Sequence, residues 1–191
     1  MKIIVVSGGF DPLHSGHIEY FNEAKKLGDK LIVALNSDNW LISKKGKFFM
    51  PFNERATIIR NIAVVDDVIN FKDDSLGSCI LGLEKIKTLY PDDLITFCNG
   101  GDRDQGNIPE MTVKGINFEF GVGGNNKKNS SSWILKEFAY DNEVRIWGKF
   151  YNLFSDSGEQ DIKVKELIIY PGKGLSFQRH FHRSELWFVS K

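Results

Sequence analysis

Along the first 140 residues, short apolar runs alternate with segments of helical periodicity, and this alternation constrains the fold most. Residues 3–6 form a continuous apolar run that ends at Ser7-Gly8-Gly9, the pattern of a strand buried on both faces and followed by a turn. Gly28 is placed as the C-cap of the helix that follows. Apolar residues recur in that helix at Ile18, Phe21, Ala24 and Leu27.

The same alternation continues downstream. We expect strands at residues 31–35, 64–71, 94–98 and 116–120 and helices at residues 55–62, 80–89 and 130–139, with Asn53 as an N-cap. Strands that alternate with helices form right-handed βαβ units. The sequence therefore predicts an α/β fold, a Rossmann-like open parallel sheet with helices on both faces.

The pattern changes near Asp141. Helix signals vanish, and short apolar runs at residues 145–147, 164–170 and 186–189 are separated by turn residues. We predict a first domain at residues 1–141 and a short β-rich C-terminal appendage at residues 144–191. Roughly 48 residues cannot bury a normal independent core.

Charge and composition exclude several classes of partner. The 191 residues carry a net charge of zero, so nucleic acid and anionic membranes exert no general attraction. No apolar stretch approaches the ~18 residues of a membrane span. The two cysteines, Cys79 and Cys98, form no CxxC pair and are typical of reduced thiols in a cytoplasmic protein. The sequence is compatible with a homodimer.

The first predicted strand ends in the segment GGFDPLHSGH at residues 8–17, which opens the first predicted helix. Free N–H groups at a helix start favour anions, and Gly8 and Gly9 let the backbone approach a phosphate closely. His14 and His17 lie three residues apart, so both can face one ligand and stabilise charge on a phosphorus atom under attack. A helix cap beside a surface histidine, or a metal site, would also explain the pair, although no carboxylate or cysteine completes a metal site.

The same segment resembles the GxFDxxHxGH signature of the cytidylyltransferase-like nucleotidyltransferases. That superfamily includes glycerol-3-phosphate cytidylyltransferase, pantetheine-phosphate adenylyltransferase and the heptose-1-phosphate adenylyltransferase domain of bifunctional heptose enzymes. Residues 24–38 and 99–102 are especially similar to the heptose type, with Asn99 in place of a lysine. The resemblance implies catalytic roles for His14 and His17 at the phosphates. It also implies a nucleotide site that contains Gly8, Gly9, Phe10, Asp11 and Gly16.

A basic cluster surrounds Gly46 and is either a solvated loop or, as in the family, a phosphate-contacting loop. Lys45 matches the heptose-type LKG segment, whereas Lys47 matches better when counted back from Arg55, so both are candidate catalytic lysines beside Lys44. Arg55 resembles the arginine of the family's ER segment. It would hold a phosphate, brace the lysine loop or form a structural salt bridge.

Two later segments complete the implied nucleotide site. Gly101, Asp102 and Arg103 follow a predicted strand; the resemblance implies Asp102 at the ribose or base and Arg103 at the acceptor phosphate. Residues 104–110 would shape the acceptor pocket. Lys128 and three serines precede the last helix, where hydroxyls suit the β- and γ-phosphates or simply cap the helix. The serines are Ser130, Ser131 and Ser132.

The resemblance implies transfer of a nucleoside monophosphate from ATP or CTP to a sugar phosphate or polyol phosphate, with release of pyrophosphate. Mg²⁺ would accompany the triphosphate. A pantetheine-phosphate adenylyltransferase-like enzyme is one alternative, since Ser130 to Ser132 followed by Lys136 and Glu137 is similar to its signature. A non-catalytic nucleotide- or sugar-binding protein is the other.

Residues 171–187 resemble the cupin domain attached to mannose-1-phosphate guanylyltransferases and related mannose-6-phosphate isomerases. His180, His182 and Glu185 match the HxH-then-Glu metal motif of that family, and alternate residues of a strand face one side. The segment is expected to be a divalent-metal site, an inert β appendage or half of a sugar-binding module.

Overall fold

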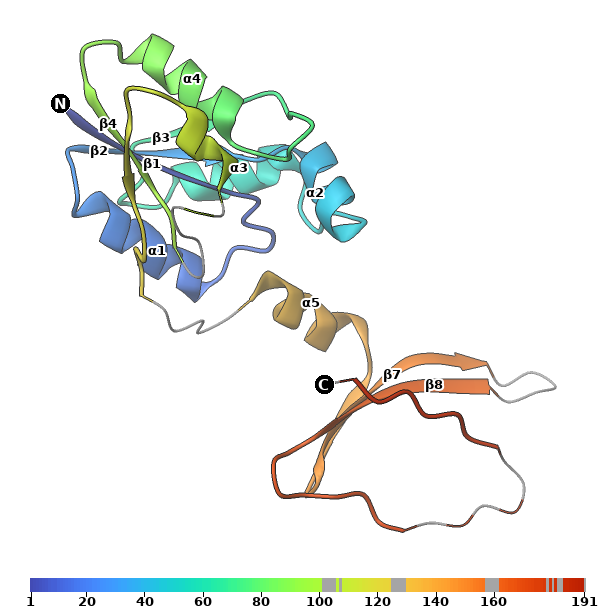
Figure 1. The fold of residues 1–191 in the computed structure, drawn as a ribbon. Helices are drawn as coiled ribbons and strands as arrows, with labels where there is room; N and C mark the ends of the chain where they lie inside the picture. The colour runs from blue at the N-terminus through green and yellow to red at the C-terminus, as the bar shows by residue number, and fades with distance from the viewer. Residues whose placement is uncertain are drawn as a thin grey trace. The chain divides into compact units, whose positions relative to one another are not determined.

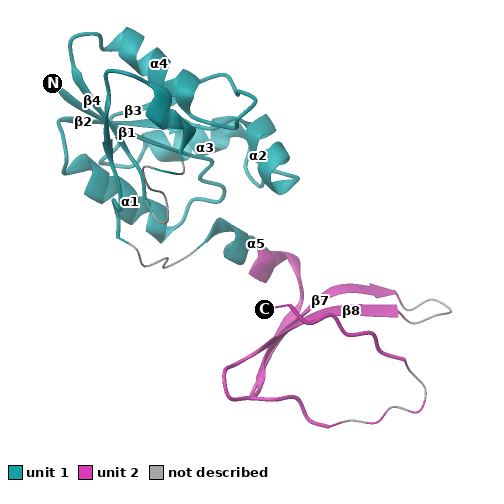
Figure 2. Ribbon diagram, viewed as in Figure 1, with its two compact units in different colours: residues 1–135 teal, residues 136–191 magenta. Residues whose placement is uncertain are grey.

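The computed structural model describes residues 1–100, 106, 108–124, 130–156, 162–177, 179, 181 and 184–190. The chain forms two compact units, residues 1–135 and 136–191 (Figure 2). The division falls inside a helix that ends just before Asp141, where the sequence pattern changes.

The first unit is built on a five-stranded sheet in which every neighbouring pair is parallel (Figure 1). The strand order is β3-β2-β1-β4-β5, so the direction of winding reverses beside β1. The predicted Rossmann-like α/β fold is confirmed. The strands are β1 (Lys2–Gly8), β2 (Lys30–Leu35), β3 (Asp67–Asn70), β4 (Leu94–Cys98) and β5 (Asn117–Glu119).

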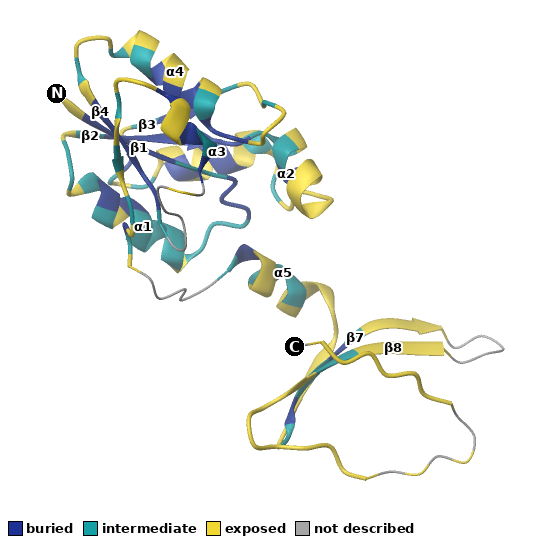
Figure 3. Cartoon of the chain, in the orientation of Figure 1, coloured by how far each residue is buried: buried dark blue, intermediate teal, exposed yellow. Residues whose placement is uncertain are grey.

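Helices cover both faces of this sheet. Ile4 and Val6 of β1 pack with α1 and α3, whereas Ile3 and Val5 pack with α4 and with the two residues that flank the 3₁₀ helix η1. All four side chains are 0 % exposed, which explains why residues 3–6 of β1 are apolar in succession instead of at every second position (Figure 3). The helices are α1 (Ser15–Lys25), α2 (Asp38–Lys45), α3 (Phe52–Arg60), α4 (Ile80–Leu89), η1 (Pro109–Thr112) and α5 (Ser131–Ala139).

One helix, α2, was not expected from the pattern. Its ends carry ordinary capping signals: the Ser37 hydroxyl accepts a hydrogen bond from the Trp40 N–H at 3.0 Å, and Gly46 follows in the left-handed region with φ 82°. Lys44 and Lys45 therefore belong to the last turn of a helix and not to a loop.

Two predicted caps were placed wrongly. Helix α3 begins at Phe52, whose N–H donates to the Asp38 carboxylate at 3.1 Å, so Asn53 is not its cap. Helix α1 ends at Lys25, and Gly28 lies against β1. A Cβ at Gly28 would stand 2.7 Å from both the Ile4 side chain and the Lys2 carbonyl oxygen, so the glycine is required by close packing.

The second unit contains a small antiparallel sheet in the order β6-β7-β8. Its strands are β6 (Asn142–Arg145), β7 (Gly148–Asp156) and β8 (Ile162–Ile169). The C-terminal half of α5 packs on it, with the Glu137 carboxylate accepting from Lys149 at 2.5 Å and also from Tyr151. The predicted β-rich appendage is confirmed, although residues 186–189 form no strand. Within the described part of the chain, no helix is long and apolar enough to cross a bilayer.

We predict that Gly28→Ala lowers the free energy of unfolding of the first unit by about 1–3 kcal/mol, because the new methyl group overpacks against β1. Denaturant unfolding followed by tryptophan fluorescence measures the loss. Gly174→Ala is the matched substitution at a glycine with no atom within 4 Å of the added Cβ, and it should leave the transition unchanged. Equal effects of the two substitutions would contradict the packing argument.

Candidate active site

A cleft of about 200 Å³ opens at the carboxyl end of β1 in the first unit. Its lining comes from the end of β1 and the turn after it, the start of α1, Asn36 after β2, helix α2, the loop between β3 and α4, η1, and the first residue of α5. The cleft lies beside the point where the strand order reverses, which is where open α/β sheets bind ligands.

The first turn is held by tight packing. Phe10 has a φ of 47°, an unusual conformation for a large side chain, and its ring contacts those of His17 and Phe21 edge-on at centroid distances of 5.0 and 4.9 Å. A Cβ at Gly8 would lie 2.9 Å from the Phe10 ring, and one at Gly9 would lie 2.6 Å from Leu41. Both glycines line the cleft, so packing as well as ligand access favours glycine there.

The two histidines of the turn stack on one another, with ring centroids 3.6 Å apart and an interplanar angle of 22°. The His14 backbone N–H donates to Nδ1 of His17 at 3.3 Å, which leaves Nε2 as the protonated nitrogen of a neutral His17 ring. His17 lines the cleft, whereas His14 stacks against its ring. A Cβ at Gly16 would lie 3.2 Å from the His14 ring, a tight contact that would press on the stacked pair.

Both imidazoles are held neutral in the unliganded protein. Burial, followed by the neighbouring charges of His14 and Lys45, lowers the pKa of His17 to about 3. Burial and then Lys45 also lower the pKa of His14. A neutral Nε2–H donates a hydrogen bond, and an arriving polyanion would raise both pKa values because it stabilises imidazolium.

The lysines at the end of α2 differ in their placement. Lys44 and Lys45 line the cleft, whereas Lys47 does not. Lys45 Nζ donates to the Asp11 carbonyl oxygen at 3.2 Å, and partial burial is the largest cause that lowers its pKa. Lys44 Nζ lies 4.4 Å from the centroid of the Trp40 ring. The structure thus brings Lys45, and not Lys47, to the first turn.

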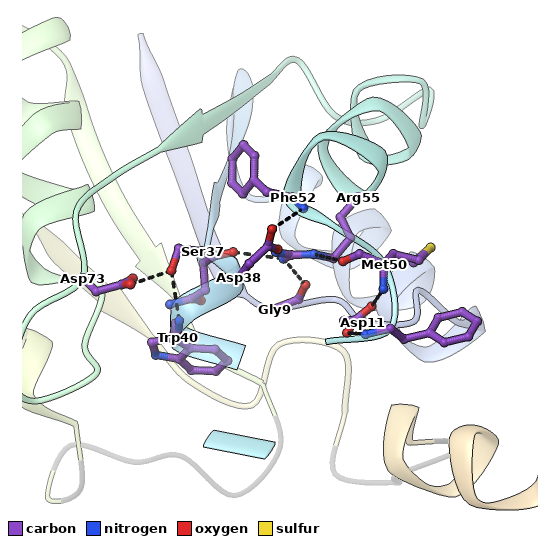
Figure 4. A network of polar contacts seen from close by, with 11 residues as sticks. Gly9, Asp11, Ser37, Asp38, Trp40, Met50, Phe52, Arg55 and Asp73 are labelled. Atoms are coloured by element: carbon purple, nitrogen blue, oxygen red, sulfur yellow. Dashed lines mark hydrogen bonds and ion pairs between the residues drawn. The ribbon is translucent and has the colours of Figure 1, made fainter. Parts of the chain in front are cut away.

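Two predicted nucleotide-site residues serve as internal braces (Figure 4). The buried Asp11 carboxylate accepts hydrogen bonds from the N–H groups of Phe49 at 2.6 Å and Met50 at 2.8 Å. Asp11 therefore anchors the segment between α2 and α3 to the first turn, and its side chain is 1 % exposed.

The second brace is Arg55, which is also 1 % exposed. Its Nη1 donates to the carbonyl oxygens of Gly9 at 2.7 Å and Asn36 at 2.9 Å, and its Nη2 pairs with the Asp38 carboxylate at 2.6 Å. Nε donates to the carbonyl oxygen of Met50 at 3.0 Å. Of the roles considered for Arg55, the structure shows the bracing one, with the salt bridge to Asp38 as part of it.

The start of α5 meets the first turn. The Ser131 hydroxyl donates to the Pro12 carbonyl oxygen at 2.9 Å, and Ser131 lines the same cleft as His17. The Ser130 carbonyl accepts the first helical bond of α5, and Ser132 is exposed and does not line the cleft. The imidazole pair and the serine-rich helix entry therefore converge, as the nucleotide hypothesis requires.

Several predicted residues lie outside the described part of the chain. These are Gly101, Asp102, Arg103, Lys128, His180 and His182. Glu185 is described; it is exposed and accepts a hydrogen bond from Trp187 Nε1 at 3.2 Å. Among the described residues, no three His, Cys, Asp or Glu side chains are grouped as a metal site.

The cleft also contains residues that sequence reasoning did not single out. Trp40 reaches it from α2, and Gly77 and Cys79 reach it from the loop after β3. The Trp40 Nε1–H donates to the Gly77 carbonyl oxygen at 2.8 Å, which joins the two walls. Glu110, the last residue of the stretch 104–110 that was expected to shape the acceptor pocket, lines the cleft from η1. The sequence feature that could have identified these residues is their position after predicted strands, because loops that follow parallel strands meet at the carboxyl edge of the sheet.

Comparison with known proteins identifies two family models. Residues 5–136 match the model described as cytidylyltransferase-like, and residues 136–191 match the model described as mannose-6-phosphate isomerase C-terminal. The two matches meet at Lys136, the first residue of the second compact unit.

Curated relatives match the first part of the chain. The bifunctional protein HldE of Blochmanniella pennsylvanica is 37 % identical over 140 residues, which cover 68 % of this chain and 27 % of that protein. The bifunctional protein HldE of Enterobacter sp. strain 638 is 34 % identical over 152 residues, covering 74 % and 29 %. The chain thus spans less than a third of the length of these relatives.

A solved structure shares the fold. It is the bifunctional NMN adenylyltransferase/ADP ribose pyrophosphatase of Francisella tularensis, complexed with AMP and a manganese ion. The match has a TM-score of 0.51 at 17 % identity and covers 72 % of this chain and 41 % of that one. At this identity the similarity concerns the fold alone.

We predict that Arg55→Ala lowers the free energy of unfolding by about 3–5 kcal/mol, because it leaves the Asp38 carboxylate and three carbonyl oxygens without their donor. Arg60→Ala on the same helix removes one hydrogen bond, to the Val68 carbonyl oxygen at 3.2 Å, and should cost about 1 kcal/mol or less. Urea unfolding of both variants measures the difference. Similar losses would show that Arg55 is not the central brace.

We predict that the free energy of unfolding falls as the solution is acidified, in part because His17 is buried in its neutral form. Its pKa is about 3 in the folded protein and ~6.5 in the unfolded chain, so between these values the unfolded state binds more protons. Stability is therefore greatest above pH ~6.5 and falls towards pH 3. The slope of unfolding free energy against pH between 7 and 5 should be smaller in His17→Asn, which does not titrate.

The same shift is visible directly by NMR. The His17 ring resonances of the free protein should stay at their neutral positions down to about pH 5. Titration near pH 6.5 would contradict the burial that the structure shows.

Proposed function

Because the chain belongs to the cytidylyltransferase-like family, we propose that it is a nucleotidyltransferase that acts on a phosphorylated sugar or polyol. It would transfer a nucleoside monophosphate from a nucleoside triphosphate, ATP or CTP, and release pyrophosphate. The observation that carries this proposal is the convergence of His17, Lys45 and Ser131 on one cleft at the carboxyl edge of the sheet.

The chemistry of the lining suits a triphosphate. Neutral His17 donates through Nε2, Lys45 supplies positive charge, and the start of α5 at Ser131 offers the positive end of a helix dipole. In this mechanism the acceptor phosphate attacks the α-phosphorus in line, the bond to the β-phosphate oxygen breaks, and pyrophosphate departs. The protein acts by orienting the two substrates and stabilising the added negative charge, with no covalent intermediate.

The histidines and the serines divide this work. His17 donates at the α- and β-phosphates, and His14 supports it by stacking and through its backbone N–H. Ser131 contacts the departing pyrophosphate, and Lys45 contacts the group in transfer. Asp102 at the ribose or base, Arg103 at the acceptor phosphate and Lys128 with Ser130 at the terminal phosphates are parts of the same proposal.

Mg²⁺ enters with the triphosphate in this scheme. The lysines and imidazoles of the cleft suit the phosphate oxygens and not the cation, so the ion would be held mainly by phosphates and water. When bound, it neutralises charge on the phosphates. The lysines then complete that neutralisation from the protein side.

Two independent features support a sugar phosphate as acceptor. The first part of the chain resembles heptose adenylyltransferases, and the second unit matches a family named for mannose-6-phosphate isomerase. We accordingly assign residues 1–141 to the transferase domain and residues 144–191 to a partial cupin-like segment. The buried cysteines Cys79 and Cys98 support a cytoplasmic location, and a homodimer remains a prediction.

We predict that the wild-type protein releases pyrophosphate from ATP or CTP when supplied with a sugar phosphate or polyol phosphate. His17→Ala should reduce kcat about 10²–10³-fold, because a charge-stabilising donor is lost. Ser131→Ala should reduce it roughly 10-fold, because the bond to the Pro12 carbonyl that ties α5 to the first turn is lost, whereas the exposed neighbour Ser132→Ala should retain activity. Pyrophosphate release measured against a panel of acceptors tests all four proteins.

Two results would redirect the assignment. Release with phosphopantetheine alone would support the pantetheine-phosphate adenylyltransferase-like alternative. Triphosphate binding measured by calorimetry, without release for any acceptor, would support a nucleotide-binding protein that does not turn over.

A further inference from the structure

Glu110 is a buried carboxylate at the cleft that the mechanism above does not use. It lies in the first turn of η1 and is 2 % exposed, yet it lines the same cleft as His17. Its Oε1 accepts a hydrogen bond from the Cys79 N–H at 2.7 Å, just before α4. The side chain is thereby fixed between two walls, one from η1 and one from the loop after β3.

The second oxygen of this carboxylate is unsatisfied. Oε2 takes almost no solvent and has no hydrogen-bond partner among the residues that the structure describes. Buried carboxylate oxygens are normally paired, because losing water without a replacement donor is costly. A buried carboxylate that lines a cleft, with one oxygen bonded and the other unpaired, is suited to a donor that arrives with a ligand.

The charge of Glu110 restricts which part of a ligand it meets. A carboxylate repels phosphate, and the groups that suit phosphate come from other elements: His17 from the first turn, Lys45 from α2 and Ser131 from α5. The residue that contacts Glu110 directly is Cys79, whose backbone N–H is uncharged. The complementary ligand group is therefore an uncharged donor, and in a phosphorylated sugar or polyol that donor is a hydroxyl.

Resting on the proposed function, we infer that Glu110 accepts a hydrogen bond from a hydroxyl of the acceptor and so selects acceptors by their hydroxyl pattern. A site built around a hydrogen-bond acceptor discriminates strongly against an analogue that lacks the matching hydroxyl, because the buried oxygen is then left unpaired. Glu110 is a specificity-determining residue in this scheme, and the phosphate chemistry stays with the other walls.

Glu110→Gln tests the inference with little change of shape. The Cys79 N–H needs an acceptor, so the amide oxygen must face it and the NH₂ must face the cleft, where it is a donor. We expect kcat/KM for the acceptor to fall about 10- to 100-fold. KM for the triphosphate and the Mg²⁺ concentration for half-maximal rate should stay within about twofold. Glu84→Gln, the same change at an exposed position of α4, should match wild type.

Acceptor analogues identify the hydroxyl. Each hydroxyl of the active acceptor is replaced in turn by hydrogen or by fluorine, which accepts but does not donate. We expect one position at which both replacements lower wild-type kcat/KM by about the same factor. In Glu110→Gln those replacements should cause little further loss, because the two changes remove one interaction. The 2′-deoxy and 3′-deoxy triphosphates should lower kcat/KM by the same factor in wild type and in Glu110→Gln.

Four outcomes would overturn the inference. They are unchanged acceptor kinetics in Glu110→Gln, a selective rise in its Mg²⁺ requirement, coupling to a ribose hydroxyl of the triphosphate, or a wild-type enzyme indifferent to every acceptor hydroxyl. The last measurement uses the wild-type enzyme, so it can overturn the inference even if Glu110→Gln does not fold. Absence of pyrophosphate release by wild type would instead remove the proposed function itself, before Glu110 is tested.

Discussion

The site depends on one buried cation. The guanidinium of Arg55 joins the first turn, the end of β2, the start of α2 and the segment before α3 through Gly9, Asn36, Asp38 and Met50. Its rigid fork of donors matches three carbonyls and a carboxylate, and these bonds offset the cost of removing the charge from water. Because the Gly9 turn and α2 form two walls of the cleft, the placement of His17 and Lys45 follows from this pairing.

In the first turn and the elements around Arg55, different residues hold the backbone in place and face the ligand. Asp11 and Arg55 are buried and hydrogen-bonded to the backbone, whereas His17, Lys45 and Ser131 line the cleft. The stacked imidazoles are kept neutral by burial, so they present hydrogen-bond donors without a fixed positive charge. Positive charge comes from the lysines at the end of α2. A polyanion entering this cleft would strengthen both sets of interactions, since it favours protonated groups.

The local sequence pattern predicted the structure correctly where a run of apolar residues is also the run that the fold buries. The apolar run at residues 3–6 predicts a doubly covered strand, and β1 has four side chains with no exposure. The pattern failed where a residue is required by a contact with a segment far away in the sequence. Gly28 has the spacing of a helix cap, yet Ile4 and Lys2 of β1 require it. Helix α2 was missed because its short amphipathic signal is weak, although Ser37 and Gly46 cap it.

The sequence alone determined the α/β class, the β-rich appendage and the turn that bears His14 and His17, because periodicity and a long motif are local properties. Tertiary structure decided which candidates meet. It places Lys45 and Ser131 at the cleft, turns Arg55 and Asp11 into braces, and leaves one oxygen of Glu110 unpaired. These distinctions depend on which elements pack together across the carboxyl edge of the sheet, and spacing along a chain does not carry that information.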